Sequence, residues 1–176
     1  SLFTSNFSDA TDQVTGGSSA NTLAGVAIVG NAATAGEGAW HYFNGTSWIA
    51  VGSPSSASAL LAAAGDKLRF LPAANYNGTP GSLTVAVVDN SSGAITSGNT
   101  VNLSGGSATG GTTVYSVATV VLGTSVTAVN DPPVLDPSKS PALSAVLEDA
   151  AVPSGAVGTL VSALVDSGGS LSNVTD

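Results

Sequence analysis

Residues 40–51 read WHYFNGTSWIAV, so two short aromatic and aliphatic runs stand on either side of Asn44-Gly45. Asn and Gly tolerate the positive φ angles of the two-residue turns that join antiparallel strands. The stretch therefore predicts a β-hairpin in which Trp40 and Trp48 flank the turn on paired strands. Because large aromatic rings usually pack inside a fold, we expect both tryptophans to contribute to a core.

The same arrangement recurs along most of the chain. Short runs rich in β-branched and aromatic residues alternate with Gly, Asn, Ser and Pro, and no long apolar stripe with a helical period is present. This pattern is typical of an all-β fold, a β-sandwich. The expected strands are residues 23–29, 39–43, 47–51, 67–71, 82–89, 114–122 and 125–129.

Two stretches between these strands are less regular. Residues 55–64 are rich in Ala and Leu and predict a helical turn. Residues 90–113 are rich in Gly, Ser, Thr and Asn, which favours a long hairpin or loop. We expect one short strand inside that loop, at residues 100–103.

Composition and charge narrow the classes of partner. The 176 residues are enough to bury a core, and they carry three basic and eleven acidic side chains, a formal net charge of −8. Three basic side chains cannot neutralise several phosphate groups of a nucleic acid or of an anionic membrane. Both are therefore poor partners for this chain. No apolar run is long enough to span a membrane, and the first residues lack a signal-peptide pattern, so we expect any export signal elsewhere in a longer precursor. The absence of Cys and Met suits an extracellular protein.

The amino-acid composition changes at residues 130–133, which read NDPP. Two consecutive prolines remove two backbone donors and fix φ, so a strand ends there and a stiff connector begins. We therefore predict a first domain at residues 1–132 and a junction with further strands at residues 133–176. The strand candidates of this second part are residues 145–147 and 157–165, and the part is too short for a core of its own.

The two ends of the chain resemble each other. Residues 7–12 (FSDATD) match residues 171–176 (LSNVTD) position by position in chemical type, at an offset of 164 residues. Such a match can arise by chance in so restricted a composition; otherwise the chain is one full repeat cut out of phase. In the second interpretation residues 133–176 open the next repeat, and the first domain lacks its own opening strands.

Three segments carry a more specific pattern. They are TAVNDPPVL at residues 127–135, EDAAVPSGAVGTLV at residues 148–161 and PAANYNG at residues 72–78, after the tryptophan hairpin. Together they resemble the cadherin-like tandem repeats of giant bacterial adhesins, the group that includes VCBS-type repeats. The resemblance implies a Greek-key β-sandwich of cadherin or immunoglobulin type, calcium at the repeat junctions, and a secreted extender or adhesive unit without catalytic residues. Where many such repeats read NVTDAD, residues 10–14 read ATDQV, so one acidic position is missing.

Several acidic and amide side chains stand near these junctions. Calcium takes about six to eight oxygen ligands on backbone that can bend to place them. Two carboxylates within about 4 Å repel by roughly 4 kcal/mol without a cation, so clustering favours a metal. The alternative is that these side chains cap turns or are solvated, and we expect Asp66 and Asp136 to be such turn residues. The candidate calcium ligands are Asp9, Asp12, Asp89, Asn130, Asp131, Glu148 and Asp149.

The inventory of side chains argues against catalysis. His41 is the single histidine and Cys is absent, so neither a triad nor a zinc site can be assembled. Glu37 lies near the hairpin but lacks a second carboxylate for glycoside hydrolysis. We therefore expect a protein that is not an enzyme. The alternative function is carbohydrate binding by exposed rings, for which Trp40, Tyr42 and Trp48 are the candidates.

The phase of the repeat predicts a contact between copies. A domain that lacks its opening strands leaves an open sheet edge and an uncovered apolar strip. We expect residues 138–176 to pack outside the body formed by residues 1–130 and to insert as a strand into a neighbouring copy. Repeated head to tail, this contact does not close and builds a filament. If the chain is a division of a longer polypeptide, the same contact is the covalent run from one repeat to the next.

Overall fold

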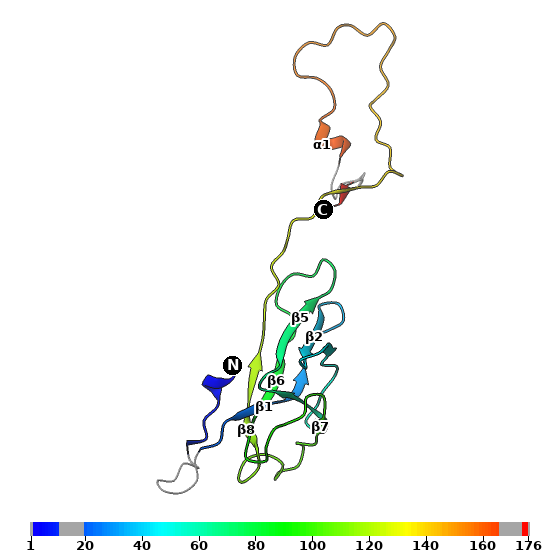
Figure 1. Ribbon diagram of the computed structural model, residues 1–176. Coiled ribbons are helices and arrows are strands. Elements are labelled where there is room, and N and C mark those ends of the chain that lie inside the picture. The colour runs from blue at the N-terminus through cyan, green and yellow to red at the C-terminus, as the bar shows by residue number, and fades with distance from the viewer. Residues whose placement is uncertain (1, 11–19, 166–173, 176) are drawn as a thin grey trace. The chain divides into compact units, whose positions relative to one another are not determined.

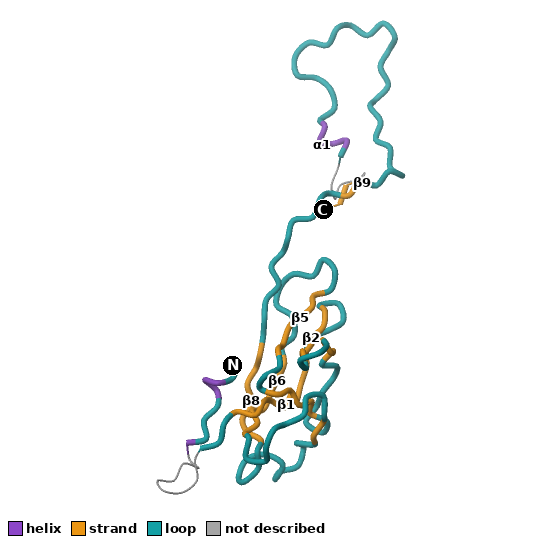
Figure 2. The backbone as a smooth tube through the Cα atoms, in the orientation of Figure 1, coloured by secondary structure: helices purple, strands orange, loops and turns teal. Residues whose placement is uncertain are grey.

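The computed structural model describes residues 2–10, 20–165 and 174–175, and the chain divides into two compact units. Unit 1 spans Ser1–Ala128 and unit 2 spans Val129–Asp176. Helix is scarce among the described residues, where the named helical elements are a 3-10 turn, η1 (Thr4–Asn6), and a short helix, α1 (Val161–Leu164). Figures 1 and 2 show that the strands gather in unit 1, whereas most of unit 2 is loop.

Unit 1 contains two antiparallel sheets. One is built from β1 (Leu23–Asn31), β4 (Ala59–Ala63), β6 (Leu83–Asp89), β7 (Thr100–Val101) and β8 (Tyr115–Leu122). The other is built from β2 (Gly38–Phe43), β3 (Trp48–Ala50) and β5 (Lys67–Pro72). The strand order is β7-β4-β1-β6-β8 in the larger sheet and β3-β2-β5 in the smaller one.

The hairpin predicted around Asn44-Gly45 is confirmed as β2 and β3. Phe43 pairs with Trp48 across it, and Gly45 has a φ of 93°, a value that glycine adopts without strain. The Asn44 side-chain oxygen accepts the N–H groups of Thr46 and Ser47 at 3.0 and 2.9 Å. The turn is therefore held by its own asparagine, as residues of this type do in many turns.

The main core lies between the two sheets. Ile28 and Val85 of the larger sheet are fully buried, and they share one apolar cluster with Trp40 and Tyr42 of the smaller sheet. The Trp40 indole N–H donates to the Gly81 carbonyl at 2.8 Å, so the buried ring keeps its one polar group satisfied. The prediction of an all-β sandwich is thus confirmed.

A second apolar cluster covers the outer face of the larger sheet. Ala27, Ala86 and Val88 point into it from the central strands, and Leu103 is buried with them. Leu103 and its partly buried neighbour Ile95 belong to the long segment between β6 and β8, which was expected to be mostly loop. This segment carries the predicted short strand, β7, and closes the sheet on its second face.

Two of the strand and helix predictions in unit 1 are wrong. Residues 55–64 do not form a helical turn, because Ala59 and Leu60 pair with β7 and the same strand, β4, pairs with β1 on its other side. Tertiary pairing outweighs the helical preference of Ala and Leu there. Residues 125–129 form no strand, and the only pairing described for them is a bridge between Val126 and Gly78.

Unit 2 differs from the sequence prediction more strongly. Residues 145–147 are not a strand, and within residues 157–165 the chain forms α1 instead. The described pairing in this unit joins β9 (Val134–Leu135) to β10 (Val174–Thr175). An apolar run becomes a strand only where a neighbouring strand satisfies its backbone groups, and within the described part of unit 2 no strand pairs with residues 145–165.

Candidate calcium and docking sites

Two of the predicted calcium ligands line one cavity of unit 1. Asp9 and Asp89 both border a space of about 250 Å³, together with Ser8, Thr113 and Ser116. Asp9 follows η1 in the N-terminal segment, and Asp89 is the last residue of β6. The sequence places them 80 positions apart, so only the fold brings these carboxylates to one cavity.

Hydrogen bonds fix both carboxylates in place. An Asp9 oxygen accepts the backbone N–H of Asn21 at 2.7 Å, which ties the N-terminal segment to the residues before β1. One Asp89 oxygen accepts both the backbone N–H and the hydroxyl of Ser91, at 2.7 and 2.5 Å. Each carboxylate has a second oxygen that could serve as a cation ligand.

The polar side chains that line this cavity carry carboxylate, hydroxyl and amide groups, whose oxygens are ligands that a hard cation accepts. Two carboxylates are fewer than calcium usually takes, and Asp12 lies outside the described residues. Across residues 2–10, 20–165 and 174–175, no group of three or more His, Cys, Asp or Glu side chains is positioned to hold a metal ion. Calcium therefore stays a prediction.

The junction candidates lie in unit 2 and in exposed loop. Asn130, Asp131, Glu148 and Asp149 are all exposed. The Asn130 side-chain amide donates to the Asp131 carbonyl at 3.0 Å, a local bond that does not involve the Asp131 carboxylate.

The two aspartates expected to be turn residues behave as such. The Asp136 carboxylate accepts the Ser138 hydroxyl at 2.6 Å and the Ser138 N–H at 3.0 Å, and these bonds hold the pKa of Asp136 below its ordinary value. Asp66 follows a turn in which its N–H donates to the Ala63 carbonyl at 2.9 Å.

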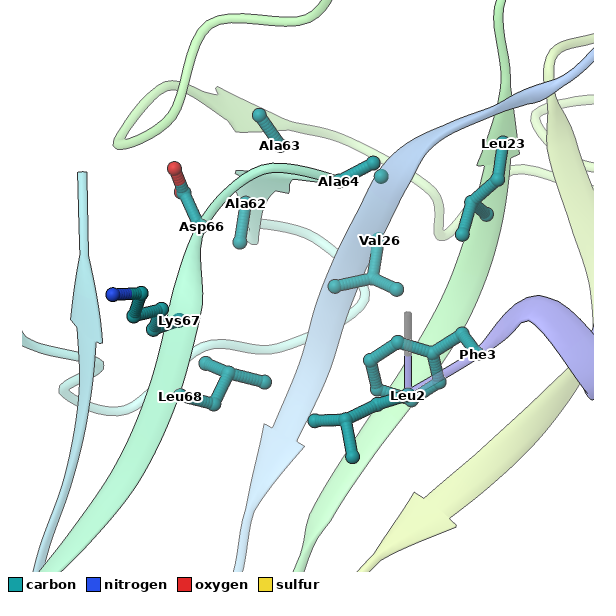
Figure 3. Close-up of a pocket in the computed structure, with 11 residues that line it drawn as sticks. Leu2, Phe3, Leu23, Val26, Ala62, Ala63, Ala64, Asp66, Lys67 and Leu68 are labelled. Carbon is teal, nitrogen blue, oxygen red and sulfur yellow. The ribbon is translucent and has the colours of Figure 1, made fainter. Parts of the chain in front are cut away.

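A larger, mostly apolar cavity of about 430 Å³ lies between the two sheets (Figure 3). One wall comes from β1, with Leu23 and Val26, and the opposite wall comes from β5, with Leu68. Figure 3 shows Leu2 and Phe3 of the N-terminal segment beside Val26, with the Leu68 side chain pointing toward them. Phe3 is 7% exposed and belongs to the main core.

The sequence analysis predicted an uncovered apolar strip, but not the residues that line this cavity. The local signal for its N-terminal side is the apolar pair Leu2-Phe3. The pair occupies one end of the cavity because β5 is the last strand of the smaller sheet, so the space between the sheets is open on that side. The cavity is many times larger than the volume that one water molecule needs.

The carbohydrate-binding alternative required exposed rings, and two of its three candidates are buried. Trp40 and Tyr42 are each 3% exposed and form part of the core. Trp48 is 37% exposed, contrary to the expectation of core packing, because it lies on the edge strand β3, whose three residues are all exposed. The Arg69 guanidinium carbon lies 4.0 Å from the centroid of the Trp48 ring, and Phe43 packs at 5.3 Å, so Trp48 is already a partner in a small surface cluster.

The groups weighed for catalysis have structural partners. His41 Nδ1 lies 3.2 Å from the Ala39 carbonyl oxygen. The Glu37 carboxylate accepts the Thr34 N–H at 2.7 Å and the Thr34 hydroxyl at 3.1 Å, and the backbone bond is the main reason why the pKa of Glu37 is lowered. Burial and the Glu37 charge raise the pKa of the nearby Tyr76 hydroxyl.

Comparison with known proteins gives no family for this chain: no family model, no curated protein and no solved structure matches it. Among the described residues, no helix is both long enough and apolar enough to cross a membrane.

Proposed function

We propose that this chain is an extracellular, non-enzymatic repeat module that is stiffened by calcium and assembles end to end into a long surface adhesin or filament. One observation carries the proposal. Unit 1 leaves an apolar cavity open between its sheets, while unit 2 exposes apolar side chains such as Val146 and Val152, at 85% and 92%. An exposed apolar segment and an unfilled apolar seat in one chain are complementary.

The path of the chain supports a Greek-key, cadherin-like architecture as part of this proposal. The chain crosses between the sheets after β1, after β3, after β4 and after β5. Sandwiches of the cadherin and immunoglobulin type are wound in this way, with sequential strands shared between two sheets. The junction segment at residues 127–135 and the absence of catalytic groupings are in keeping with a structural unit.

Two places support the calcium part of the proposal. The cavity of Asp9 and Asp89 would hold a cation within unit 1, and Asp131 and Glu148 would hold one at the junction, where oxygen ligands from a neighbouring copy would complete the shell. Extracellular modules bind calcium with dissociation constants of about 0.1–1 mM, so the ion stiffens a chain only outside the cell.

Sedimentation velocity of the purified chain over a range of concentrations tests the assembly. We expect concentration-dependent oligomers that grow without a defined end point, and we expect millimolar calcium to favour them, because it reduces repulsion between chains of net charge −8. A chain that stays monomeric at every concentration, with and without calcium, would contradict the proposal.

A glycan screen tests the carbohydrate-binding alternative. Binding that is lost on Trp48→Ala would favour that alternative, since Trp48 is the one of the three candidate rings that is exposed.

A further inference from the structure

We propose that the outer face of the smaller sheet binds a glycan through one carboxylated sugar, such as a uronic or sialic acid. The side chains that bind it are Lys67, Arg69 and Trp48, which together form what we call the cationic face. The inference gives the adhesive role proposed above a chemical class of target. It does not depend on end-to-end assembly, so the two proposals can fail separately.

The register of the smaller sheet places the cationic face on the side away from the core. Lys67 and Arg69 flank Leu68 on β5, and Leu68 packs against the main core, so its two neighbours point to the opposite side. Figure 3 shows the Lys67 side chain pointing away from Leu68. Trp48 of β3 and Lys67 both pair directly with Phe43 of β2, so these residues form one row across the sheet.

The charge of this face is opposite to that of the chain. Two of the three basic side chains lie on it, although the net charge is −8. Strands β2, β3 and β5 contain no acidic residue, and no carboxylate of the described residues forms an ion pair with Lys67 or Arg69. Two cations without a counter-charge attract an anion, whereas the acidic remainder of the chain disfavours a long polyanion. A single carboxylate satisfies both conditions.

Arg69 is held in a geometry that suits a carboxylate. Its guanidinium carbon lies over the Trp48 ring, 4.0 Å from the ring centroid. The N–H groups of a guanidinium lie in its plane, so a ring against one face leaves them available for two parallel hydrogen bonds to a carboxylate. Among the described residues, the Arg69 Nε is one of two buried side-chain polar atoms without a hydrogen-bond partner. The group therefore has unused donor capacity beside the ring.

Trp48 supplies the apolar part of the site. Its ring is 37% exposed, and Phe43 packs against it at 5.3 Å and supports it from β2. A pyranose ring has an apolar C–H face that packs on an aromatic ring, and an acidic sugar carries its carboxylate at the rim of that ring. A neutral sugar would use only the aromatic part of this face, and an inorganic anion only its cations. An acidic sugar uses both.

Matched pairs of acidic and neutral sugars test the ligand class with the full chain. Sialyllactose and lactose form one pair, and cellobiouronic acid and cellobiose form the other. In calorimetric titrations, we expect the acidic member of at least one pair to bind about tenfold or more tightly than its neutral partner. Added salt should weaken this binding, because it depends on exposed charges. Equal affinity within both pairs, or no binding of any of these sugars, would overturn the proposal.

The two tryptophans provide an internal control for the place of binding. In NMR spectra of the isotopically labelled chain, the Trp48 indole N–H signal should shift as the acidic sugar is added. The Trp40 signal should stay, because that N–H is buried and donates to the Gly81 carbonyl. A shift of the Trp40 signal without a shift of the Trp48 signal would place the ligand elsewhere and overturn the proposal.

The three basic residues supply a matched set of variants. Arg69→Gln should weaken binding of the acidic sugar by about tenfold or more, and Arg69→Lys, which keeps the charge but not the fork of donors, should weaken it less. Lys67→Gln should weaken it by about threefold or more, and this exposed position keeps the test valid if Arg69→Gln destabilises the sheet. Lys139→Gln removes the same charge from unit 2 and should change the affinity by no more than about twofold. Equal losses from Arg69→Gln and Lys139→Gln would show general charge attraction and overturn the proposal.

Sedimentation of the same variants separates a glycan from a second copy of the chain as the occupant. An acidic segment of a second copy also carries carboxylates. If the face binds a glycan, Arg69→Gln should leave the self-association of the chain unchanged. Loss of self-association on Arg69→Gln but not on Lys139→Gln would show that the face binds a second copy, and the proposal would be wrong.

Discussion

Unit 1 and unit 2 contain similar apolar residues but bury them very differently. Ile28 and Val85 of unit 1 are fully buried, whereas Val146 and Val152 of unit 2 are almost fully exposed. The difference follows from pairing and not from hydrophobicity. Strands in unit 1 find neighbours that satisfy their backbone groups, and their side chains can then stack between two sheets. For residues 145–165, the described residues of unit 2 provide no such neighbour.

The contrast bears on the end-to-end assembly proposed above. A segment with a complete core has no reason to contact another copy, and a segment without one gains from any apolar seat that it reaches. Unit 1 has an apolar cavity next to Phe3, which we propose as such a site. Three measurements can break or sharpen this comparison of the two units.

The largest expected effect is the difference in unfolding free energy between truncating a buried side chain of unit 1 and an exposed side chain of unit 2. Ile28→Ala removes a side chain with 0% exposure and should lower the free energy of unfolding by about 2–5 kcal/mol, through lost burial and the cavity left behind. Leu147→Ala, at 82% exposure, should change it by less than about 0.5 kcal/mol in dilute solution. Urea titration of the monomer checks both values. An equal cost for the two variants would show that unit 2 buries Leu147 in solution.

A smaller expected effect is the fall in melting temperature when calcium is removed, and variants of each unit show which unit binds the ion. At about a hundredfold excess over the dissociation constant, one site stabilises by about 2.7 kcal/mol, so a chelator should lower the melting temperature by about 5–10 °C. If the ion binds in unit 1, Asp9→Asn with Asp89→Asn should abolish this sensitivity; if it binds at the junction, Asp131→Ala should do so.

The asparagine variants are matched controls for local structure. The asparagine oxygen can still accept the Asn21 and Ser91 hydrogen bonds, so the losses are the charge and the second oxygen of each carboxylate. A melting curve of the native chain that is identical with and without chelator would remove calcium from the proposed function.

The smallest expected effect is on the pH dependence of stability. It concerns the carboxylates of Glu37 and Asp136, whose pKa values are both lowered. Glu37 in unit 1 accepts bonds from Thr34 and, more weakly, from Gly81 and Tyr76, which lie far along the chain. Because its folded pKa lies below the ordinary 4.5, Glu37 stabilises the fold above about that pH, and this contribution is lost as pH falls through the folded value. Asp136 in unit 2 is lowered mainly by Ser138, its neighbour in the same turn.

Acid titration of the unfolding free energy tests this difference. Glu37→Gln should slightly reduce stability at neutral pH and flatten its decline below about pH 4.5, whereas Asp136→Asn should leave the curve for unit 1 unchanged. If Asp136→Asn changed the pH dependence of the unfolding free energy of unit 1, the turn at Ser138 would contribute to the stability of unit 1.

Much of unit 1 was determined by the sequence itself. Alternating apolar runs predicted β1, β2, β5, β6 and β8, and the Asn44-Gly45 pair predicted the hairpin, because turn chemistry and side-chain period act over a few neighbouring residues. The tertiary structure alone decided the rest. Residues 59–63 became a strand because two neighbours pair with them, Asp9 and Asp89 met because β6 ends beside the N-terminal segment, and Phe3 found its seat because the smaller sheet ends at β5. Each of these depends on contacts between residues far apart in the chain, which no local pattern encodes.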